Sequence, residues 1–204
     1  MKRTLLDCAI VLLVVCGMVS CQIVTGAIDV AREVKGFPVV VTLQDGTVVT
    51  GEAKLPNGGT KKVTVKGEDG ERHKLQAEDI LTLTAWNDKA PDMKYAMVFR
   101  DKHWLVPEAV GEHLMVFALA VDYFIEKDGD MVLKGEHFSF YGFRPGEETG
   151  TLLGTTHFAN SNKLARKYLM EYLADDPEMC ERIRDKDIEP FDYKRICEEY
   201  NPAK

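Results

Sequence analysis

Residues 37–86 have the sequence FPVVVTLQDGTVVTGEAKLPNGGTKKVTVKGEDGERHKLQAEDILTLTAW, and this stretch decides the fold. Apolar and polar residues alternate within five short runs, for example over 63–66, and this alternation is typical of a half-buried strand. Two Asp-Gly steps and one Asn-Gly-Gly step separate the runs and supply the positive φ angles that tight hairpin turns need. The stretch therefore predicts a small five-stranded, barrel-like module. Its strands are expected at 39–43, 47–55, 61–66, 71–75 and 80–86.

The following part of the chain also has strand patterns. Residues 95–100 and 104–106 flank a short polar turn and predict a hairpin. The apolar segment 114–125 fits a helix or a buried strand by periodicity alone, but its β-branched and aromatic residues favour a strand. A second β layer is therefore expected over 93–146, and the glycine-rich segment 146–154 is expected to be a loop.

From Ser161 onward the pattern is helical. Ser161 or Asn162 can cap a first helix by accepting hydrogen bonds from exposed backbone amides. Pro177 suits the first turn of a second helix, and Asp192 can cap a third. Strands followed by helices, without alternation, predict an α+β protein whose strands are mostly antiparallel and which ends in a tail of three helices over 161–201.

The first twenty residues differ from the rest. Lys2 and Arg3 form a basic head, an uninterrupted apolar run follows over 9–15, and small residues lead to Cys21. This order predicts an export signal over 1–20, and its apolar part is shorter than the ~20 residues of a membrane-spanning helix. A buried N-terminal core helix is the alternative, but such helices have polar positions that this run lacks.

The end of the signal resembles the lipobox of bacterial lipoproteins. Val19-Ser20-Cys21 stands where that motif has its acylated cysteine, which becomes the first mature residue. The resemblance implies lipidation of Cys21, a tether over 21–36, and a location on the periplasmic or outer surface of a bacterial cell envelope. Ordinary signal cleavage near Thr25-Gly26-Ala27 is the competing interpretation.

The composition limits the partners. The chain has 204 residues, of which 45% are hydrophobic and 29% charged, so it is a globular protein of one or two domains. Removal of residues 1–20 leaves 24 basic and 32 acidic residues, a net charge of −8. An acidic protein has no general attraction for phosphate backbones or anionic membrane surfaces, so no nucleic-acid partner is expected.

Two segments resemble uncharacterised bacterial envelope proteins. The first is the module around Val41–Gly46, Lys61–Val65 and Ala77–Leu83, and the second is the helical end from Tyr172 to Asn201. The resemblance implies the same architecture and an envelope location. It implies no activity and no site residue, because none is established for that group.

Few residues are candidates for chemistry. The five histidines lack the spacing of a zinc site, but Gly111-Glu112-His113 and Gly135-Glu136-His137 repeat one tripeptide. If both precede strands of one sheet, Glu112, His113, Glu136 and His137 could hold a metal. The alternative is that both are polar entries into apolar strands. No catalytic residue and no cofactor are otherwise indicated.

Cys180 and Cys197 are the other cysteines of the mature chain. An oxidising compartment would make them candidates for a disulfide, while their apolar neighbours also allow two buried thiols. The sequence as a whole favours a non-catalytic, lipid-anchored envelope protein that binds a protein, peptide or glycan. The alternative is an envelope hydrolase, metal-dependent through the Glu-His pairs.

We expect Cys21→Ser to release the protein from the membrane to the soluble envelope fraction. An acyl chain contributes ~0.8 kcal/mol of membrane affinity per buried methylene, and the serine variant cannot be acylated. Fractionation of envelopes and mass measurement of the N-terminal peptide test this. Recovery of soluble, unmodified wild-type protein would contradict the lipoprotein assignment.

Overall fold

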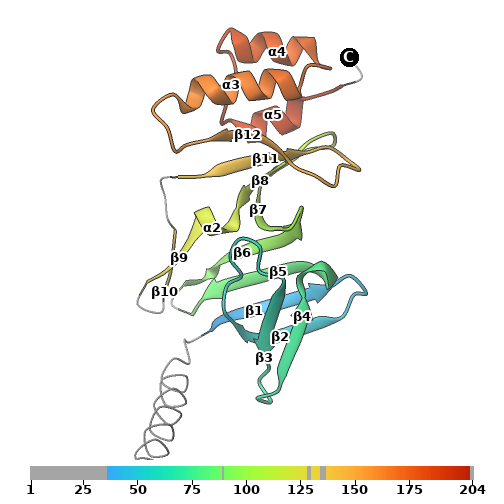
Figure 1. The fold of residues 1–204 in the computed structure, drawn as a ribbon, viewed down its shortest axis with the longest axis vertical. Coiled ribbons are helices and arrows are strands. Elements are labelled where there is room, and N and C mark those ends of the chain that lie inside the picture. Colours follow the sequence, from blue (N-terminus) through green and yellow to red (C-terminus); the bar gives the residue numbers. More distant parts are fainter. Residues whose placement is uncertain (1–35, 89, 128–129, 134–136, 203–204) are drawn as a thin grey trace, which may run out of the picture. The chain divides into compact units, whose positions relative to one another are not determined.

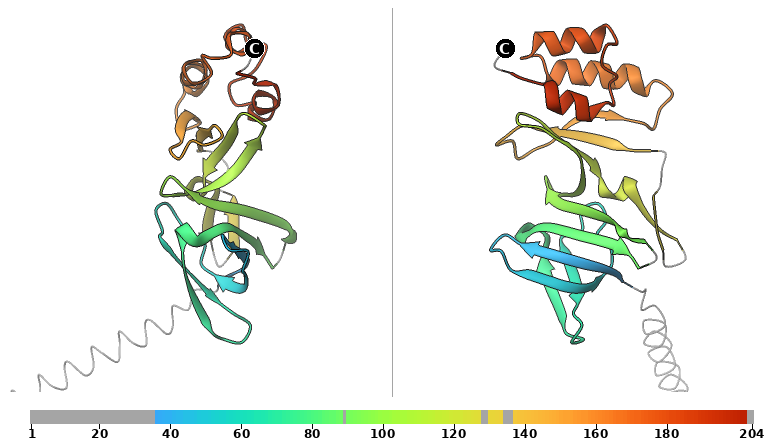
Figure 2. Two further views of the ribbon diagram at one scale, coloured as in Figure 1. Left: turned by 90° about the vertical axis from the view of Figure 1, so that its right-hand side faces the viewer. Right: turned by 180° about the vertical axis from the view of Figure 1, so that it is seen from behind.

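The computed structural model describes residues 36–88, 90–127, 130–133 and 137–202 (Figure 1, Figure 2). The predicted signal at 1–20 and nearly all of the tether at 21–36 lie outside these residues. Residues 36–204 form one compact unit. None of the described helices is long and apolar enough to cross a membrane.

Ten strands form one open, antiparallel sheet in the order β12-β11-β8-β7-β6-β5-β1-β2-β3-β4. Strands β9 and β10 form a separate hairpin. The strands are β1 (Phe37–Leu43), β2 (Val48–Ala53), β3 (Lys62–Lys66), β4 (Arg72–Gln76), β5 (Ile80–Asn87), β6 (Ala90–Arg100), β7 (His103–Val110), β8 (Met115–Leu119), β9 (Phe124–Lys127), β10 (Asp130–Leu133), β11 (Ser139–Phe143) and β12 (Thr151–Thr155).

The five short strands of 37–86 form where their turn residues predict them. In the β1–β2 turn the Asp45 carboxylate accepts a hydrogen bond from the Thr47 amide at 2.8 Å, and Gly46 has a φ of 86°. The β3–β4 turn repeats this arrangement with Asp69 and Gly70. Strand β1 pairs with both β2 and β5, and a short 3-10 helix, η1 (Ala77–Asp79), precedes β5.

The prediction of a barrel-like module is not confirmed, because β4 and β5 do not pair to close a barrel. Both edges of β5 are occupied, one by β1 and the other by β6, and β4 is the edge of the sheet. Sequence alternation sets which face of a strand is buried, but it does not determine which edges meet. The described fold is therefore an α+β arrangement built on an open sheet.

The core enclosed by β1–β5 extends into the strands that follow. Trp104 on β7 is fully buried among residues of these strands, together with Met97 and Val106. Its indole N–H donates to the Thr60 carbonyl at 2.8 Å, and its amide donates to the Gly58 carbonyl at 3.2 Å. The β6–β7 hairpin that carries it forms as predicted around Asp101 and Lys102, which have φ angles of 49° and 63°.

A second core lies between the sheet and the helices. Leu114, Val116 and Ala118 around β8 pack with apolar residues of β11, β12 and the three C-terminal helices. These helices are α3 (Ser161–Tyr172), α4 (Pro177–Arg184) and α5 (Tyr193–Glu199), and α2 (Ala120–Tyr123) is a single turn between β8 and β9. Figure 1 and Figure 2 show α3, α4 and α5 gathered at the β12 end of the sheet.

Three local predictions need correction. The strand expected over 114–125 is interrupted by α2. The loop expected over 146–154 ends in strand β12, because Leu153 is fully buried and residues 151–155 pair with β11. Ser161 is the first helical residue rather than a cap, and its hydroxyl bonds to Phe158 instead of a helix amide.

The other two helix starts form as predicted. The Asp176 carboxylate accepts from the Met179 amide at 3.0 Å, with Pro177 in the first turn of α4. The Asp192 carboxylate accepts from the Arg195 amide at 3.3 Å and caps α5. Both carboxylates satisfy backbone donors that a helix start leaves without partners.

We expect Trp104→Phe to lower the free energy of unfolding by about 2 kcal/mol, because it removes part of a fully buried side chain and leaves the half-buried Thr60 carbonyl without its indole donor. Trp86→Phe is the matched control, since Trp86 is half-buried on the outer face of β5, and it should cost under about 1 kcal/mol. Urea unfolding followed by circular dichroism measures both. Equal losses would contradict the role given to the indole.

Candidate functional site

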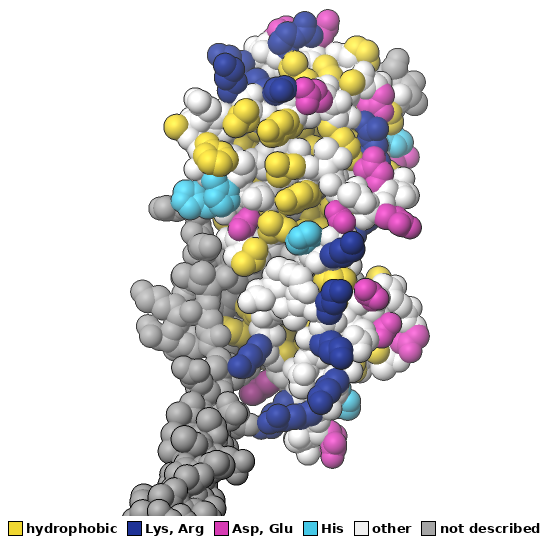
Figure 3. All heavy atoms as spheres, in the orientation of Figure 1, with side chains coloured by type: hydrophobic (Ala, Val, Ile, Leu, Met, Phe, Trp, Pro, Cys, Tyr) yellow, Lys and Arg dark blue, Asp and Glu magenta, His cyan; other side chains and the backbone are white. Residues whose placement is uncertain are grey.

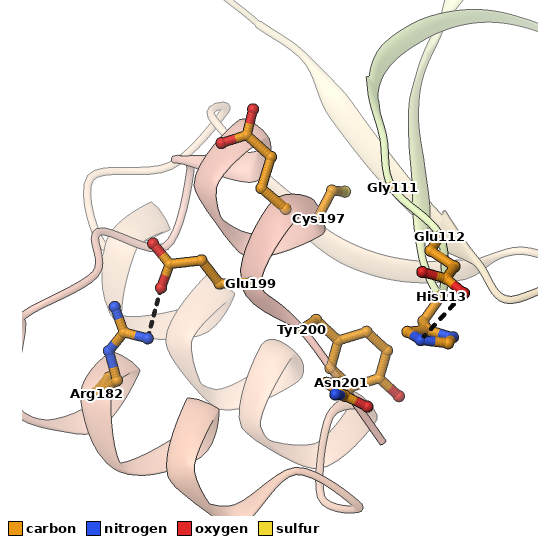
Figure 4. Close-up of a pocket in the computed structure, with 9 residues that line it drawn as sticks. Gly111, Glu112, His113, Arg182, Cys197, Glu199, Tyr200 and Asn201 are labelled. Atoms are coloured by element: carbon orange, nitrogen blue, oxygen red, sulfur yellow. Dashed lines mark ion pairs between the residues drawn. The ribbon is translucent and has the colours of Figure 1, made fainter. Parts of the chain in front are cut away.

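A polar pocket of about 430 Å³ lies between the β7–β8 turn and α5 (Figure 4). Gly111 makes this junction possible, because a Cβ there would lie 2.0 Å from the Cys197 carbonyl oxygen on α5. Only glycine lets the turn approach the helix backbone so closely. The pocket is lined by Gly111, Glu112, His113, Arg182, Cys197, Glu198, Glu199, Tyr200 and Asn201.

The floor of the pocket is a network of ion pairs between α4, α5 and the loop that joins them. Arg182 on α4 pairs with Glu199 on α5 and, at 3.0 Å, with Asp187 in the loop. Arg195 also reaches Glu199, at 2.9 Å, and Asp187, at 3.5 Å. Hydrogen bonds from Arg195 and Arg182 hold the pKa of the Glu199 carboxyl below its usual range. Glu199 is therefore a carboxylate with its charge already compensated.

Two further pocket groups are held in their neutral forms. Burial raises the pKa of the Cys197 thiol to about 12. Burial, together with the hydrogen bond that its hydroxyl donates to Asp175 at 3.0 Å, raises the pKa of Tyr200 to about 12. A neutral thiol is a poor nucleophile, and a phenol with such a pKa is a poor base near neutrality.

Arg144 fixes the wall behind the pocket. It follows β11, pairs with Asp175 at 3.0 Å, and its guanidinium carbon lies 4.7 Å from the centre of the Tyr172 ring and 5.8 Å from that of Tyr200. The Tyr172 hydroxyl donates to Glu147 at 2.6 Å. This network connects the β11–β12 loop, the end of α3 and the residue after α5.

Asp176 connects two distant segments at the same place. Its side chain is almost completely buried, and besides capping α4 it accepts from the Asn201 amide at 3.0 Å. A buried carboxylate is tolerated only when it is hydrogen-bonded. Asn201 is thereby held at the edge of the pocket.

The structure separates His113 from His137, the histidines of the two predicted Glu-His pairs. Glu112 and His113 lie at the rim of the pocket, with 4.0 Å between their side chains and the Glu112 side chain 88% exposed. Glu136 lies outside the described residues. His137 stacks on His157 at a ring distance of 5.0 Å.

The strand register explains this separation. In the antiparallel pair of β8 and β11, Met115 lies opposite Phe143 and Ala118 opposite Phe140. His113 precedes β8 and His137 precedes β11, so they stand at opposite ends of the pair, roughly 26 Å apart over eight residues at ~3.3 Å per residue. The hypothesis that both pairs share a metal is therefore not supported. Within the described part of the chain, no group of three or more His, Cys, Asp or Glu side chains is arranged to hold a metal ion.

The cysteine predictions have different outcomes. Cys21 lies outside the described residues, so its lipidation stays a prediction. Cys180 and Cys197 are free thiols in the structure. The Cys180 thiol bonds to the Leu173 carbonyl at 3.2 Å, whereas Cys197 belongs to the core between the helices and β8.

Sequence reasoning missed most of the pocket. In the sequence, Glu199 is an ordinary acid near the end of a helix, and Arg182 and Asn201 carry no functional signal. They lie beside the β7–β8 turn, which is about 70 to 90 residues earlier, because α5 packs on β7 and β8. The helical spacing of Arg195 and Glu199, four residues apart, is the one local sign of an ion pair there.

No family model, curated protein or solved structure matches the chain. The resemblance to bacterial envelope proteins therefore stays a prediction from the quoted segments.

We expect peptide mapping of denatured, unreduced protein to find Cys180 and Cys197 both fully alkylated. In the native protein at pH 8, Cys197 should react at least about tenfold more slowly than Cys180, since it is more deeply buried and its thiolate form is rarer. A disulfide-linked peptide containing both residues would contradict the free thiols.

Proposed function

We propose that the protein is an exported, lipid-anchored envelope protein that binds a protein, peptide or glycan partner at this pocket without chemical turnover. The observation that carries the proposal is the state of Cys197, Glu199 and Tyr200. Their pKa values are all displaced away from neutrality. Catalytic acids, bases and nucleophiles are usually tuned in the opposite direction, toward the working pH.

The rim of the pocket favours a partner that carries hydrogen-bond donors. Glu112 and Glu198 present exposed carboxylates, while the charge of Arg182 is already compensated by Glu199 and Asp187. Ammonium, amide and hydroxyl groups are the donors that such acceptors bind. Peptides and glycans both present these groups.

We also infer a division of labour within the fold. Residues 37–86 would serve as a barrel-like module, residues 93–146 as the second β layer, and residues 161–201 as a helical tail that forms one wall of the pocket. This division is supported by the core that β1–β5 form together with Met97, Trp104, Val106 and Ala120. It also agrees with the pocket, where residues 161–201 contribute six of the nine lining residues.

The alternative is an envelope hydrolase that uses the Glu-His pairs. Such an enzyme would need both pairs, or one pair and a further group, around a single substrate atom. The register of β8 and β11 gives this no support, because it places His113 and His137 at opposite ends of a strand pair. Binding is therefore the better-supported function.

A photoreactive residue at Glu112 tests the proposal in intact envelopes. Glu112 lies on the rim, and we expect it to give a discrete cross-linked product that Glu198→Lys reduces at least about fivefold, as expected for loss of a charged hydrogen bond. The matched control is the same photoreactive residue at Glu171, which lies on α3 away from the pocket and is 64% exposed.

Equal products from positions 112 and 171 would contradict a partner at the pocket. Purified protein that carried zinc in a one-to-one ratio and lost hydrolase activity in His113→Ala would instead favour the enzyme.

A further inference from the structure

The outer face of the β3–β4 hairpin collects basic side chains. Val63 and Val65 point into the core, so the exposed residues between and beside them, including Lys62 and Lys66, point outward. Cross-strand neighbours share a face, and the register places Arg72 opposite Lys66. We call the four outward cations of this hairpin the basic face: Lys62, Lys66, Arg72 and Lys74.

Figure 3 shows this concentration of charge directly. Lys and Arg side chains follow one another over the part of the molecule where Figure 1 places β3 and β4. Glu52 on β2, opposite Lys66, adds one negative charge beside them, and the exposed residues Glu68, Asp69 and Glu71 add three more in the turn of the hairpin. Residues 61–76 contain five basic and three acidic side chains, whereas the chain as a whole carries a net charge of −7, so the local charge is opposite in sign to the average. A partner can respond to such a local field even when the net charge would repel it.

Prevention of edge-to-edge pairing with other chains explains only the cations on β4, which is the edge strand of the sheet. Lysine on an exposed edge strand prevents pairing with other chains, and this reason applies to β4. Strand β3 is not an edge, because it is paired on one side with β2 and on the other with β4. Edge protection therefore does not account for Lys62 and Lys66.

The basic face lies beside the point where the chain enters the folded unit. Gly36 packs against Glu52 and Ala53, and Phe37 pairs with Ala53. Ala53 in turn pairs with Val65, the neighbour of Lys66. Two strand spacings of ~4.8 Å separate the chain entry from β3, so the entry and the end of the basic face are roughly 10 Å apart.

We propose that the basic face rests on the anionic headgroups of the membrane that holds the lipid anchor. This inference rests on the anchor at Cys21 in the proposed function. The sixteen residues from Cys21 to Gly36 reach at most about 55 Å, which brings the basic face within contact of the membrane surface. Each cation near an anionic bilayer contributes about fivefold in affinity, and these cations act together.

This contact would orient the protein. Strands β3 and β4 stand at one end of the sheet order, and the strands β7 and β8 that contact α5 stand several strands away. A membrane under the basic face would leave the pocket beside Gly111 free for a partner in the envelope space. The anchor would then attach the protein to the membrane, and the basic face would set its orientation relative to the membrane surface.

Lysine acetylation of the full chain in vesicles tests the proposal. The protein purified from envelopes, with the proposed acyl anchor at Cys21, is reconstituted into vesicles of phosphatidylcholine, or of phosphatidylcholine with about 30% phosphatidylglycerol, at low salt. We expect acetylation of Lys62, Lys66 and Lys74 to slow at least about threefold with the anionic lipid and to recover at about 0.5 M salt, because screening shortens the reach of the field. The exposed lysines Lys163 on α3 and Lys194 on α5 should react equally in both vesicles.

A pair of double variants provides the matched control. Lys66→Gln with Lys74→Gln removes about 25-fold of the attraction, so the protection of the remaining Lys62 should become clearly weaker. Lys163→Gln with Lys194→Gln removes the same charge from the helices and should leave that protection intact.

Three results would overturn the proposal. The first is that the lysines of the basic face are acetylated at the same rate in both vesicles. The second is that acetylation of Lys163 and Lys194 slows with the anionic lipid as much as that of the basic face. Protection by soluble polyglutamate, with none from anionic vesicles, would assign the basic face to an acidic protein instead. A chain that floats with neither vesicle contradicts the anchor itself, whereas one that floats without protection contradicts the basic-face contact alone.

Discussion

The antiparallel pairing of β7 with β8 is the interaction on which the two halves of the folded unit depend. Trp104 and Val106 on β7 complete the core that β1–β5 enclose. Val106 lies opposite Ala118 on β8, and Ala118 belongs to the core beneath the helices. Because cross-strand neighbours point to the same side of a sheet, both cores lie on one face. One end of that face is covered by the curled sheet itself and the other by helices.

The other face of the sheet is closed in a different way. Leu105, Phe117 and Phe143 form a third, smaller cluster there. The loop after β11 returns over it, so that Gly150 packs against the Phe143 ring and the Arg100 guanidinium carbon lies 4.4 Å from its centre. Residues 104–106 of β7 and 116–118 of β8 are thus buried on both sides. This buried segment supports the β7–β8 turn, which reaches α5 and forms the pocket.

The proposed function depends on how charge is distributed along the sheet. At the helical end, arginines and carboxylates are paired with each other, and in our proposal the exposed carboxylates of Glu112 and Glu198 receive the partner. At the hairpin end, the register collects cations on the outside of β3 and β4. We propose that the lipid anchor joins the folded unit beside those cations. The hairpin end would then contact the membrane, and the helical end would bind the partner. Net charge alone argued against any attraction to an anionic surface, because it averages over faces that point in different directions.

The sequence by itself determined the elements whose signals are local. Asp45-Gly46 and Asp69-Gly70 set two hairpin turns, Asp176 and Asp192 set two helix starts, and alternation over 62–66 set the buried side of β3. These signals are local because a turn, a cap and a strand face each depend on a few neighbouring residues. Only the tertiary structure decided that the sheet stays open. It also decided that Trp104 is buried in a core whose first residues lie about sixty positions earlier, and that Gly111 packs against the Cys197 carbonyl. Strand edges and helix surfaces can each be matched by several partners, and the choice is made by the packing of the whole chain, which no short stretch of sequence contains.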